Sequence, residues 1–207
     1  MSATISRPPL PFCALRFLIQ WQQRERAIHA TFQGTPRAKA FHEALSYFGL
    51  SRTFKGIGNP LELERARRIF AAACSDYSSS AEDQVIALAK SFKNSFGKYN
   101  VSAASKLLWL THRSPFVILD TRAARGLKRI TGERFRSNNY KDYTAVWRHL
   151  YKKRHAEIAA AVDLLPKARA FMPDFRQSKR ELRQLCSAEW FRERVLDIYL
   201  WEAGDDD

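Results

Sequence analysis

The sequence predicts an all-α protein, a compact helical bundle of two packed lobes. Helix-start signals such as Asn59-Pro60 and helix-ending glycines such as Gly97 divide the chain into segments whose apolar residues recur at helical spacing. Almost no segment alternates apolar and polar residues as a half-buried strand does, and no internal repeat is visible. Together these observations argue against a fold built on a sheet.

The composition points to a nucleic-acid partner. The 207 residues include 35 lysines and arginines against 21 aspartates and glutamates, a net charge of +14. Such an excess attracts the phosphate backbone of DNA or RNA. Cys13, Cys74 and Cys186 lie far apart and form no zinc-ligand pattern, which fits a reducing cytoplasm and predicts no metal site. We also expect no cofactor, and we expect a monomer.

Membrane association is not expected. No apolar run approaches the roughly 18 residues that cross a bilayer. The first residues, MSATISRPPLPF, have a single arginine followed by prolines, unlike the basic and apolar regions of a signal peptide. The sequence therefore predicts neither a membrane span nor export.

Three helices are predicted before residue 100. The first begins at Thr35-Pro36, as N-cap and first helical position, and ends at Gly49. The second repeats this signal at Asn59-Pro60. The third is capped by Ser80 and ends at Gly97.

The middle of the chain is its most informative part. Residues 97–100 form a tight connection into a helix from about Ser102 to His112, so the two flanking helices are a helix-hairpin-helix candidate. Pro115 then opens the run Phe-Val-Ile-Leu of residues 116–119, which is too short for a helix and lacks a partner strand. We interpret this run as buried extended chain. Asp120 is placed to cap the next helix, residues 121–130.

The last third is predicted to contain one long helix and two shorter ones. The long helix runs from about Tyr140 to Leu165 and stops at Pro166. A linker around 170–173 precedes helices near 178–185 and 188–203, the second capped by Ser187 and closed by Gly204. We expect one domain over 1–207, with lobes of about 1–75 and 80–165 and the helices of 174–204 packing back on both.

Asp120 is the strongest candidate for chemistry. The plain interpretation is a helix N-cap, a common role for aspartate that contributes about 1 kcal/mol. Two features favour a functional role as well. The four preceding residues are apolar, and Arg122, Arg125 and Lys128 follow on a helix whose N-terminus is itself an anion site. Helix dipole and cations would favour the ionised carboxylate that stabilises a positively charged sugar.

Part of the chain resembles the helix-hairpin-helix DNA glycosylases, in particular the small bacterial proteins with an 8-oxoguanine DNA glycosylase-like fold. The matching residues are Ala104-Ser105-Lys106-Leu107-Leu108, Pro115 to Leu119, and Asp120. Residues 196–201 are similar to the closing helix of that group. The resemblance covers roughly 80–204, and 104–120 is its distinctive part. It implies an active site in the cleft between two lobes.

The resemblance implies an enzyme that flips a nucleotide out of duplex DNA and cleaves its N-glycosidic bond. Asp120 would stabilise the sugar cation and orient the nucleophile. Bifunctional members also use a hairpin lysine that forms a Schiff base. Counting back from Asp120 at the usual spacing reaches Ser102, one helical turn before Lys106. We therefore favour a monofunctional enzyme that leaves an abasic site. A lyase that uses Lys106, and a Lys106 that is structural or binds phosphate, remain alternatives.

Other residues would hold the DNA and the flipped base. In helix-hairpin-helix modules the backbone amides of the turn bind phosphates. The residues expected to bind DNA are Lys93, Gly97, Lys98, Tyr99, Asn100, Ser102, Arg122, Arg125 and Lys128. Trp109 and His112 lie in the helix nearest to the proposed site and are the candidates for contacting the base.

Competing functions remain open. A non-catalytic DNA- or RNA-binding helical module would need the same positive charge. A nuclease would need clustered acidic metal ligands, and the basic segments contain none. For the enzyme, the substrate would be a damaged or modified base, and both DNA repair and defence against phage are compatible settings.

Overall fold

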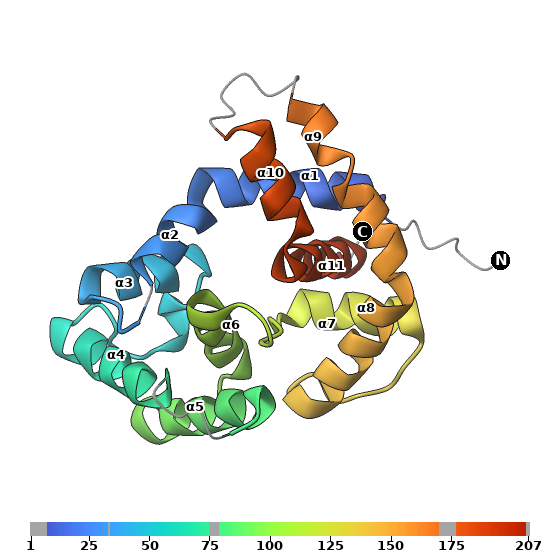
Figure 1. The fold of residues 1–207 in the computed structure, drawn as a ribbon. Helices are drawn as coiled ribbons and strands as arrows, with labels where there is room; N and C mark the ends of the chain where they lie inside the picture. Colours follow the sequence, from blue (N-terminus) through green and yellow to red (C-terminus); the bar gives the residue numbers. More distant parts are fainter. Residues whose placement is uncertain (1–7, 33, 75–78, 170–176, 206–207) are drawn as a thin grey trace. The chain divides into compact units, whose positions relative to one another are not determined.

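The computed structural model describes residues 8–32, 34–74, 79–169 and 177–205, and these residues form helices and loops without a strand (Figure 1). The predicted all-α class is confirmed. The helices, in chain order, are α1 (Leu10–Gln20), the π-helical turn η1 (Trp21–Glu25), α2 (Arg26–Thr31), α3 (Ala38–Tyr47), the 3-10 turn η2 (Ser51–Thr53), α4 (Pro60–Cys74), α5 (Ala81–Phe96), α6 (Val101–His112), α7 (Thr121–Thr131), α8 (Tyr140–Val162), α9 (Leu165–Ala168), α10 (Lys179–Ser187) and α11 (Glu189–Ala203). Within the described ranges, no helix is long and apolar enough to cross a membrane.

The helices group into two compact units that do not follow the order of the chain. Unit 1 consists of Met1–Gln23 and Asp120–Asp207, and unit 2 consists of Arg24–Leu119. The boundary between them falls directly before Asp120. The contacts thus divide the chain differently from the lobes expected along the sequence, because α1 packs with helices that follow more than a hundred residues later.

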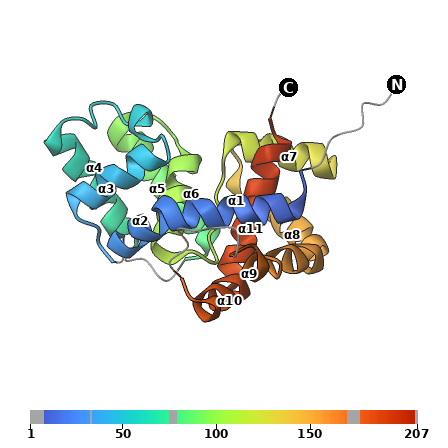
Figure 2. The same ribbon diagram turned by 90° about the horizontal axis from the view of Figure 1, so that it is seen from above.

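Helix α11 is the centre of unit 1. It packs against α1, α7, α8 and α10, and α1 also packs against α8 (Figures 1 and 2). Aromatic residues fill the space between α1 and α11, where the rings of Phe17 and Phe191 lie 4.8 Å apart. Because α11 is covered by several helices, residues on all of its faces are buried, which explains why its sequence shows so little amphipathic pattern.

Helices α7 and α11 approach each other closely through two glycines. A methyl group added to Gly126 of α7 would lie 1.9 Å from the carbonyl oxygen of Leu200. A methyl group added to Gly204, at the end of α11, would lie 1.9 Å from the carbonyl oxygen of Arg122. The absence of a side chain at both positions therefore lets the two backbones touch. Since Asp120 caps α7, this contact fixes the helix that positions it within unit 1.

Unit 2 is built around α4, α5 and α6. Helix α5 packs against both α4 and α6, and α3 packs against α4. Phe32, Phe41 and Phe70 form one aromatic cluster, with ring centroids 5.4 to 6.2 Å apart. The rings of Phe54 and Phe92 form a second, at 4.8 Å. These side chains are nearly inaccessible to solvent and make up the core of the unit.

Most local signals in the sequence mark the helix ends correctly. Helix α4 begins at Pro60, Ser80 accepts the N–H of Asp83 at the start of α5, and Gly97 ends α5 with a left-handed backbone, φ 77°. Residues 116–119 are buried and non-helical, as predicted. Glycine tolerates the positive φ of a helix end, which is why it is a dependable stop signal.

Three predictions of helix ends are wrong. Helix α3 begins at Ala38 rather than Pro36. Helix α8 ends at Val162, and Pro166 lies in the first turn of α9, where its missing N–H costs nothing. Ser187 belongs to α10 and does not cap α11, whose N-cap Ala188 has no side chain for this role. The linker expected at 170–173 lies outside the described residues.

The three cysteines are free thiols. Cys13 and Cys186 are buried in unit 1, and Cys74 is half-buried in unit 2. Burial raises the pKa of Cys13 and Cys74 to about 11 and the pKa of Cys186 to about 12. Since the thiolate is the reactive form, very little of each side chain is in that form at neutral pH.

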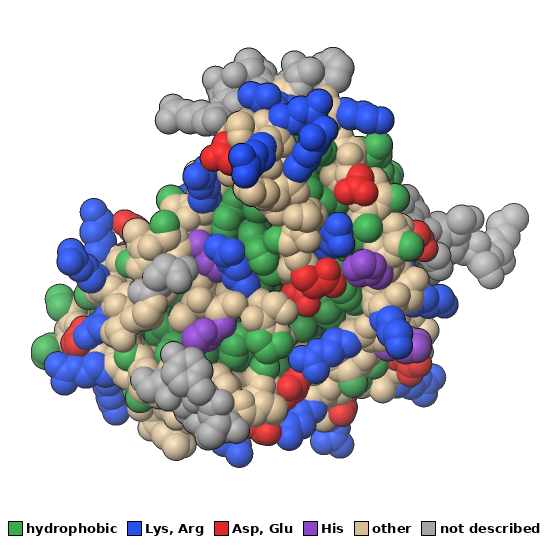
Figure 3. All heavy atoms as spheres, in the orientation of Figure 1, with side chains coloured by type: hydrophobic (Ala, Val, Ile, Leu, Met, Phe, Trp, Pro, Cys, Tyr) green, Lys and Arg blue, Asp and Glu red, His purple; other side chains and the backbone are tan. Residues whose placement is uncertain are grey.

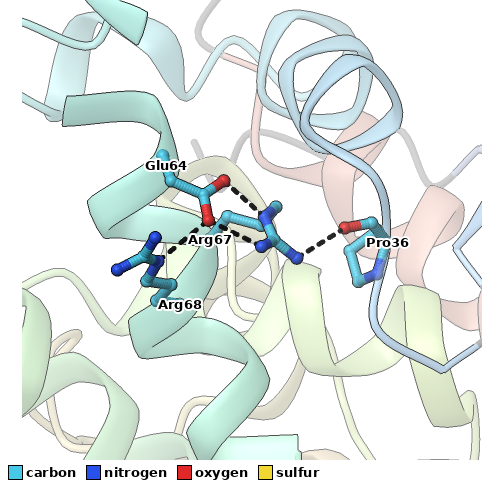
Figure 4. A network of polar contacts seen from close by, with 4 residues as sticks. All are labelled: Pro36, Glu64, Arg67 and Arg68. Carbon is cyan, nitrogen blue, oxygen red and sulfur yellow. Dashed lines mark hydrogen bonds and ion pairs between the residues drawn. The ribbon is translucent and has the colours of Figure 1, made fainter. Parts of the chain in front are cut away.

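A network of polar contacts ties α4 to the segment before α3 (Figure 4). The carboxylate of Glu64 accepts hydrogen bonds from Arg67, at 2.7 Å, and from Arg68, at 2.9 Å. Arg67 also donates to the carbonyl oxygen of Pro36 at 3.3 Å. The hydrogen bonds from the two arginines lower the pKa of Glu64 to about 2.

This network predicts a specific acid dependence. A carboxylate with a lowered pKa stabilises the fold above its usual pKa, and this contribution disappears as the pH falls toward 2. We expect Glu64→Gln to lower the Tm at pH 6, and we expect the difference from wild type to vanish near pH 2. Thermal unfolding followed by circular dichroism would measure both. Glu43→Gln, which removes the same charge from an exposed position on α3, is the control. A difference that is the same at pH 6 and pH 2 would contradict the prediction.

Candidate functional site

Asp120 begins helix α7. Its Oδ1 accepts the backbone N–H of Arg122 at 3.0 Å, and its carbonyl oxygen accepts the N–H of Ala124 at 2.8 Å. The predicted N-cap role is confirmed. The side chain is half-buried. The cap fixes one carboxylate oxygen against the helix, so the group is held in one orientation at the positive end of the helix dipole.

A buried polar network lies near Asp120 in unit 1. Trp147 Nε1 donates to Asp197 Oδ1 at 2.9 Å, and Arg194 donates to Asp197 Oδ2 at 3.2 Å. The side chains of Arg194 and Asp197 are 8% and 7% exposed. Buried charges are costly unless they are paired and hydrogen-bonded, as this pair is. The sequence interpretation did not include it, although a charged pair inside the apolar stretch of α11 is a recognisable signal.

Tyr143 connects this network electrostatically to Asp120. Burial, followed by the negative charge of Asp197 and smaller effects of Tyr140 and Asp120, raises the pKa of Tyr143 well above its usual value. Tyr143 therefore remains protonated at all ordinary pH values. A neutral hydroxyl among carboxylates can donate a hydrogen bond but cannot act as a base.

The run before Asp120 is anchored within unit 2. Ser105, in the middle of α6, is fully buried, and its hydroxyl accepts the backbone N–H of Leu119 at 3.0 Å while donating to the carbonyl oxygen of Ser102 at 3.1 Å. Leu119 is bonded directly to Asp120. The serine of the 104–108 block thus satisfies a buried backbone group of the extended run, which an apolar residue at this position could not do.

Removing the hydroxyl group of Ser105 should destabilise the protein. We expect Ser105→Ala to lower the free energy of unfolding by about 1 to 3 kcal/mol, because it leaves the buried N–H of Leu119 without its acceptor. Chemical denaturation would measure the loss. Ser46→Ala, at an exposed position of α3 in the same unit, should stay within about 0.5 kcal/mol of wild type. If the two variants are equally stable, the hydrogen bond from the Leu119 N–H to Ser105 does not stabilise the segment 116–119.

Lys106 is buried. Only 8% of the residue is exposed, and its Nζ lies 5.8 Å from the centre of the Phe48 ring. Lysines on helices usually extend into solvent, and this one does not. Lys106 belongs to unit 2 and Asp120 to unit 1.

Further ionisable side chains are buried in unit 2. Glu25, in the π-helical turn, is 1% exposed and accepts the hydroxyl of Tyr47 at 2.9 Å. His29, one helical turn later, is also 1% exposed, and its ring lies 4.9 Å from the ring of Trp109. Sequence interpretation missed both residues. π-helical turns are frequent at functional sites, but their sequence carries no local signature.

The two residues expected to contact a base differ in accessibility. Trp109 is 1% exposed and packs on His29, so it is a core residue and a poor stacking partner for a base. His112 is half-buried at the end of α6, with its ring 5.5 Å from that of Phe116. Burial lowers the pKa of His112, which keeps the imidazole neutral at neutral pH.

The turn between α5 and α6 is accessible. Lys93, Gly97, Lys98 and Tyr99 are exposed, and Ser102 is partly exposed. Asn100 caps α6 by accepting the N–H of Ala103 at 2.9 Å. The residues of this turn that were expected to bind phosphate thus have the exposure that such binding requires.

The three cations predicted on α7 have different surroundings within unit 1. Arg122 stacks 3.3 Å from the centre of the Trp201 ring, donates to the Trp201 carbonyl oxygen at 2.7 Å and pairs with Asp205 at 2.5 Å. Lys128 donates to the hydroxyl of Ser137 at 3.0 Å. Arg125 is exposed. Arg122 already contributes to the packing against α11, so Arg125 is the most accessible of these three cations.

Basic side chains are not confined to these positions. Lys179, Arg180 and Arg183 of α10 are exposed, and Figure 3 shows lysine and arginine side chains gathered around this helix. Among the described residues, no group of three or more histidine, cysteine, aspartate or glutamate side chains is placed to hold a metal ion.

Comparison with known proteins identifies no relative. No protein-family model, no curated protein and no solved structure matches the chain.

Proposed function

We propose that the protein is a monofunctional DNA glycosylase of the helix-hairpin-helix class, which removes a damaged or modified base and leaves an abasic site. One observation carries the proposal: a half-buried carboxylate, Asp120, is held at the N-terminus of α7 directly after a buried, anchored run. The net charge of +14 supplies the attraction to DNA.

Asp120 would act on the sugar of a flipped nucleotide. As the bond between C1′ and the base breaks, the electron pair leaves with the base and positive charge develops on the sugar. An adjacent carboxylate stabilises this charge more strongly than it stabilises the neutral substrate, which is what lowers the barrier. Water then adds to C1′ and loses a proton, for which Asp120 is the available acceptor.

The exposed turn from Gly97 to Tyr99, with Lys93 and Lys98, would hold the duplex by its phosphates, in the manner of a helix-hairpin-helix. The active site would lie in a cleft between two lobes, as the resemblance implies. We place the enzyme in the cytoplasm as a monomer. Its substrate would be duplex DNA with one nucleotide flipped out.

The decisive experiment exposes duplexes carrying a panel of damaged and modified bases to the protein and then to alkali. We expect strand breaks that need the alkali treatment, because a monofunctional enzyme leaves an intact backbone at the abasic site. If no duplex or single strand in a broad panel releases a base, the proposal is wrong. A non-catalytic module would bind the same DNA without releasing a base.

A lyase that uses Lys106 is the second candidate. The position of Lys106 favours it, because the amine is held inside the fold beside Phe48, and a lyase needs an amine held in a fixed place to attack a sugar aldehyde. Borohydride added during the reaction would trap the resulting imine as a covalent adduct. An adduct that disappears in Lys106→Gln would establish the lyase, and base release by Lys106→Gln at the wild-type rate without any adduct would support the monofunctional enzyme.

A further inference from the structure

Helices α9 and α10 carry a cluster of exposed cations. Its members are Lys167 on α9, Arg169 at the C-cap of α9, and Lys179, Arg180 and Arg183 on α10. The two helices pack against each other within unit 1 and lie side by side in both ribbon views (Figures 1 and 2). The space-filling view shows the resulting concentration of lysine and arginine side chains around α10 (Figure 3). We call these five residues the α9–α10 patch.

The cations of α10 lie together on the side of the helix that faces solvent. Leu182 and Cys186 are buried, whereas Lys179, Arg180 and Arg183 are exposed. Residues three or four apart on a helix are neighbours, with Cβ atoms about 5 to 6 Å apart. Arg183 is therefore adjacent to both of the other two cations. The exposed side of α10 thus presents three positive charges at close spacing.

This arrangement does not stabilise the helix that carries it. Like charges three or four residues apart destabilise a helix. Lys179 and Arg180 also lie in the first turn, at the positive end of the helix dipole, where acidic residues are favoured and cations are not. The acidic residue of α10 is Glu181, whose carboxylate accepts the N–H of Ser178 at 2.7 Å in a capping box. Since helix energetics disfavour the cluster, it points to an anionic partner.

The chemistry of the patch fits the DNA backbone. Three of its five cations are arginines, whose guanidinium groups bind phosphate through paired hydrogen bonds. One strand of duplex DNA carries a charge about every 3.4 Å along the axis, so neighbouring cations on α10 can reach separate phosphates. A helix that binds a membrane surface would also need apolar side chains to insert. Leu182 and Cys186 are buried in the protein, so α10 has little to insert.

We propose that the α9–α10 patch binds the phosphate backbone of duplex DNA, as a second contact surface in addition to the turn between α5 and α6. The inference deepens the proposed function and rests on the DNA binding in it. Helix α10 packs against α11, against which α7 with Asp120 also packs. The unit that carries the proposed catalytic carboxylate therefore has its own DNA contact. Because the contact is to phosphates, it is independent of base sequence.

The test measures DNA affinity as a function of salt. The patch variant is Lys179→Gln/Arg180→Gln/Arg183→Gln, since glutamine forms helices about as well as lysine and arginine. It is titrated with an unmodified duplex. Each phosphate contact contributes a slope of about −0.9 to the dependence of log affinity on log salt. We expect a slope about 2 to 3 shallower than that of wild type, and binding weaker by on the order of 100-fold near 0.1 M salt.

Two further variants separate the patch from total charge and from folding. Arg26→Gln/Arg37→Gln/Lys39→Gln removes the same charge from exposed positions in unit 2, and its slope should stay within about 1 of wild type. Arg180→Lys/Arg183→Lys keeps the charge and should keep the slope. The Tm of the patch variant should be at least that of wild type, because like charges are removed from one face of α10.

Several results would overturn the proposal. These are an unchanged slope in the patch variant, an equal change in the unit 2 variant, a lower Tm with unchanged affinity, or no DNA binding by wild type. Vesicles that contain phosphatidylserine test the other anionic surface. Loss of vesicle binding by the patch variant with an unchanged DNA slope would make the patch a membrane contact and would also overturn the proposal.

The outcomes distinguish this inference from the proposed enzyme. A shallower slope in the patch variant, without base release from any substrate by wild type, would keep the patch as a DNA contact and show that the glycosylase proposal is wrong. Base release by wild type with an unchanged slope in the patch variant would support the glycosylase and show that the patch does not bind DNA.

Discussion

If the protein is the proposed glycosylase, replacing Asp120 with asparagine will reduce base release by at least about 100-fold while leaving folding and DNA affinity intact. Asparagine is as good a helix N-cap as aspartate, so the bond to the N–H of Arg122 survives the substitution. Only the negative charge is lost, and with it the stabilisation of the sugar cation. Single-turnover base release from the duplex identified in the substrate panel, together with a Tm and a DNA-binding titration, measures the three quantities.

A second substitution at the same position isolates the structural contribution. Asp120→Ala removes the charge and the cap together, so we expect it to lose activity as Asp120→Asn does and, in addition, about 1 kcal/mol of stability. Should Asp120→Asn release bases at the wild-type rate, the carboxylate is a cap and nothing more, and the proposed mechanism is wrong.

Replacing Gly126 with alanine will destabilise the protein by about 3 kcal/mol, which corresponds to a fall in Tm of roughly 6 to 12 °C. The added methyl group would lie 1.9 Å from the carbonyl oxygen of Leu200, a distance that no rotation of a side chain can relieve. Helices α7 and α11 must therefore move apart, which opens the core of unit 1. Thermal and chemical denaturation would measure the loss.

Substitutions at two further glycines test whether the loss of stability comes from the close contact between α7 and α11. Gly204→Ala meets the carbonyl oxygen of Arg122 at the same 1.9 Å, so it should have a similar effect. The double variant should lose less than the sum, because helices that have already separated accommodate the second methyl group. Gly58→Ala has no atom within 4 Å of the added methyl group and should be close to neutral. Full stability of Gly126→Ala would show that the two helices are not held at this distance.

Sequence patterns correctly predicted the helix caps and helix ends that depend only on residues within one helical turn of each other. The cap at Asp120 depends on residues 120 to 122, the cap at Ser80 on residues 80 to 83, and the end of α5 on the backbone freedom of Gly97. The apolar character of residues 116–119 was enough to predict their burial, because exposing four successive apolar side chains to water is unfavourable. Such local signals also explain why the all-α class was correct.

The remaining features depend on contacts between distant residues. The bond from Trp147 to Asp197 spans 50 residues, so no pattern within one helix shows that these two side chains meet. Serine often caps helices, yet Ser187 is the last residue of α10, where its hydroxyl donates to the carbonyl oxygen of Gln184 at 2.9 Å. The burial of Lys106 reflects the packing of α6 against α2, α4 and α5, which no pattern within α6 records.

Two buried thiols in unit 1 and one half-buried thiol in unit 2 give each unit a reporter of its own opening. Cys13 and Cys186 belong to unit 1 and Cys74 to unit 2. Because burial raises the thiol pKa values to about 11 to 12, alkylation at neutral pH is faster from conformations in which the side chain has become more exposed to water. The rate at each cysteine therefore measures the free energy of the opening that exposes it. Equal free energies at Cys74 and Cys186 would mean that the units unfold as one cooperative body, and unequal ones would mean that either can open while the other stays folded.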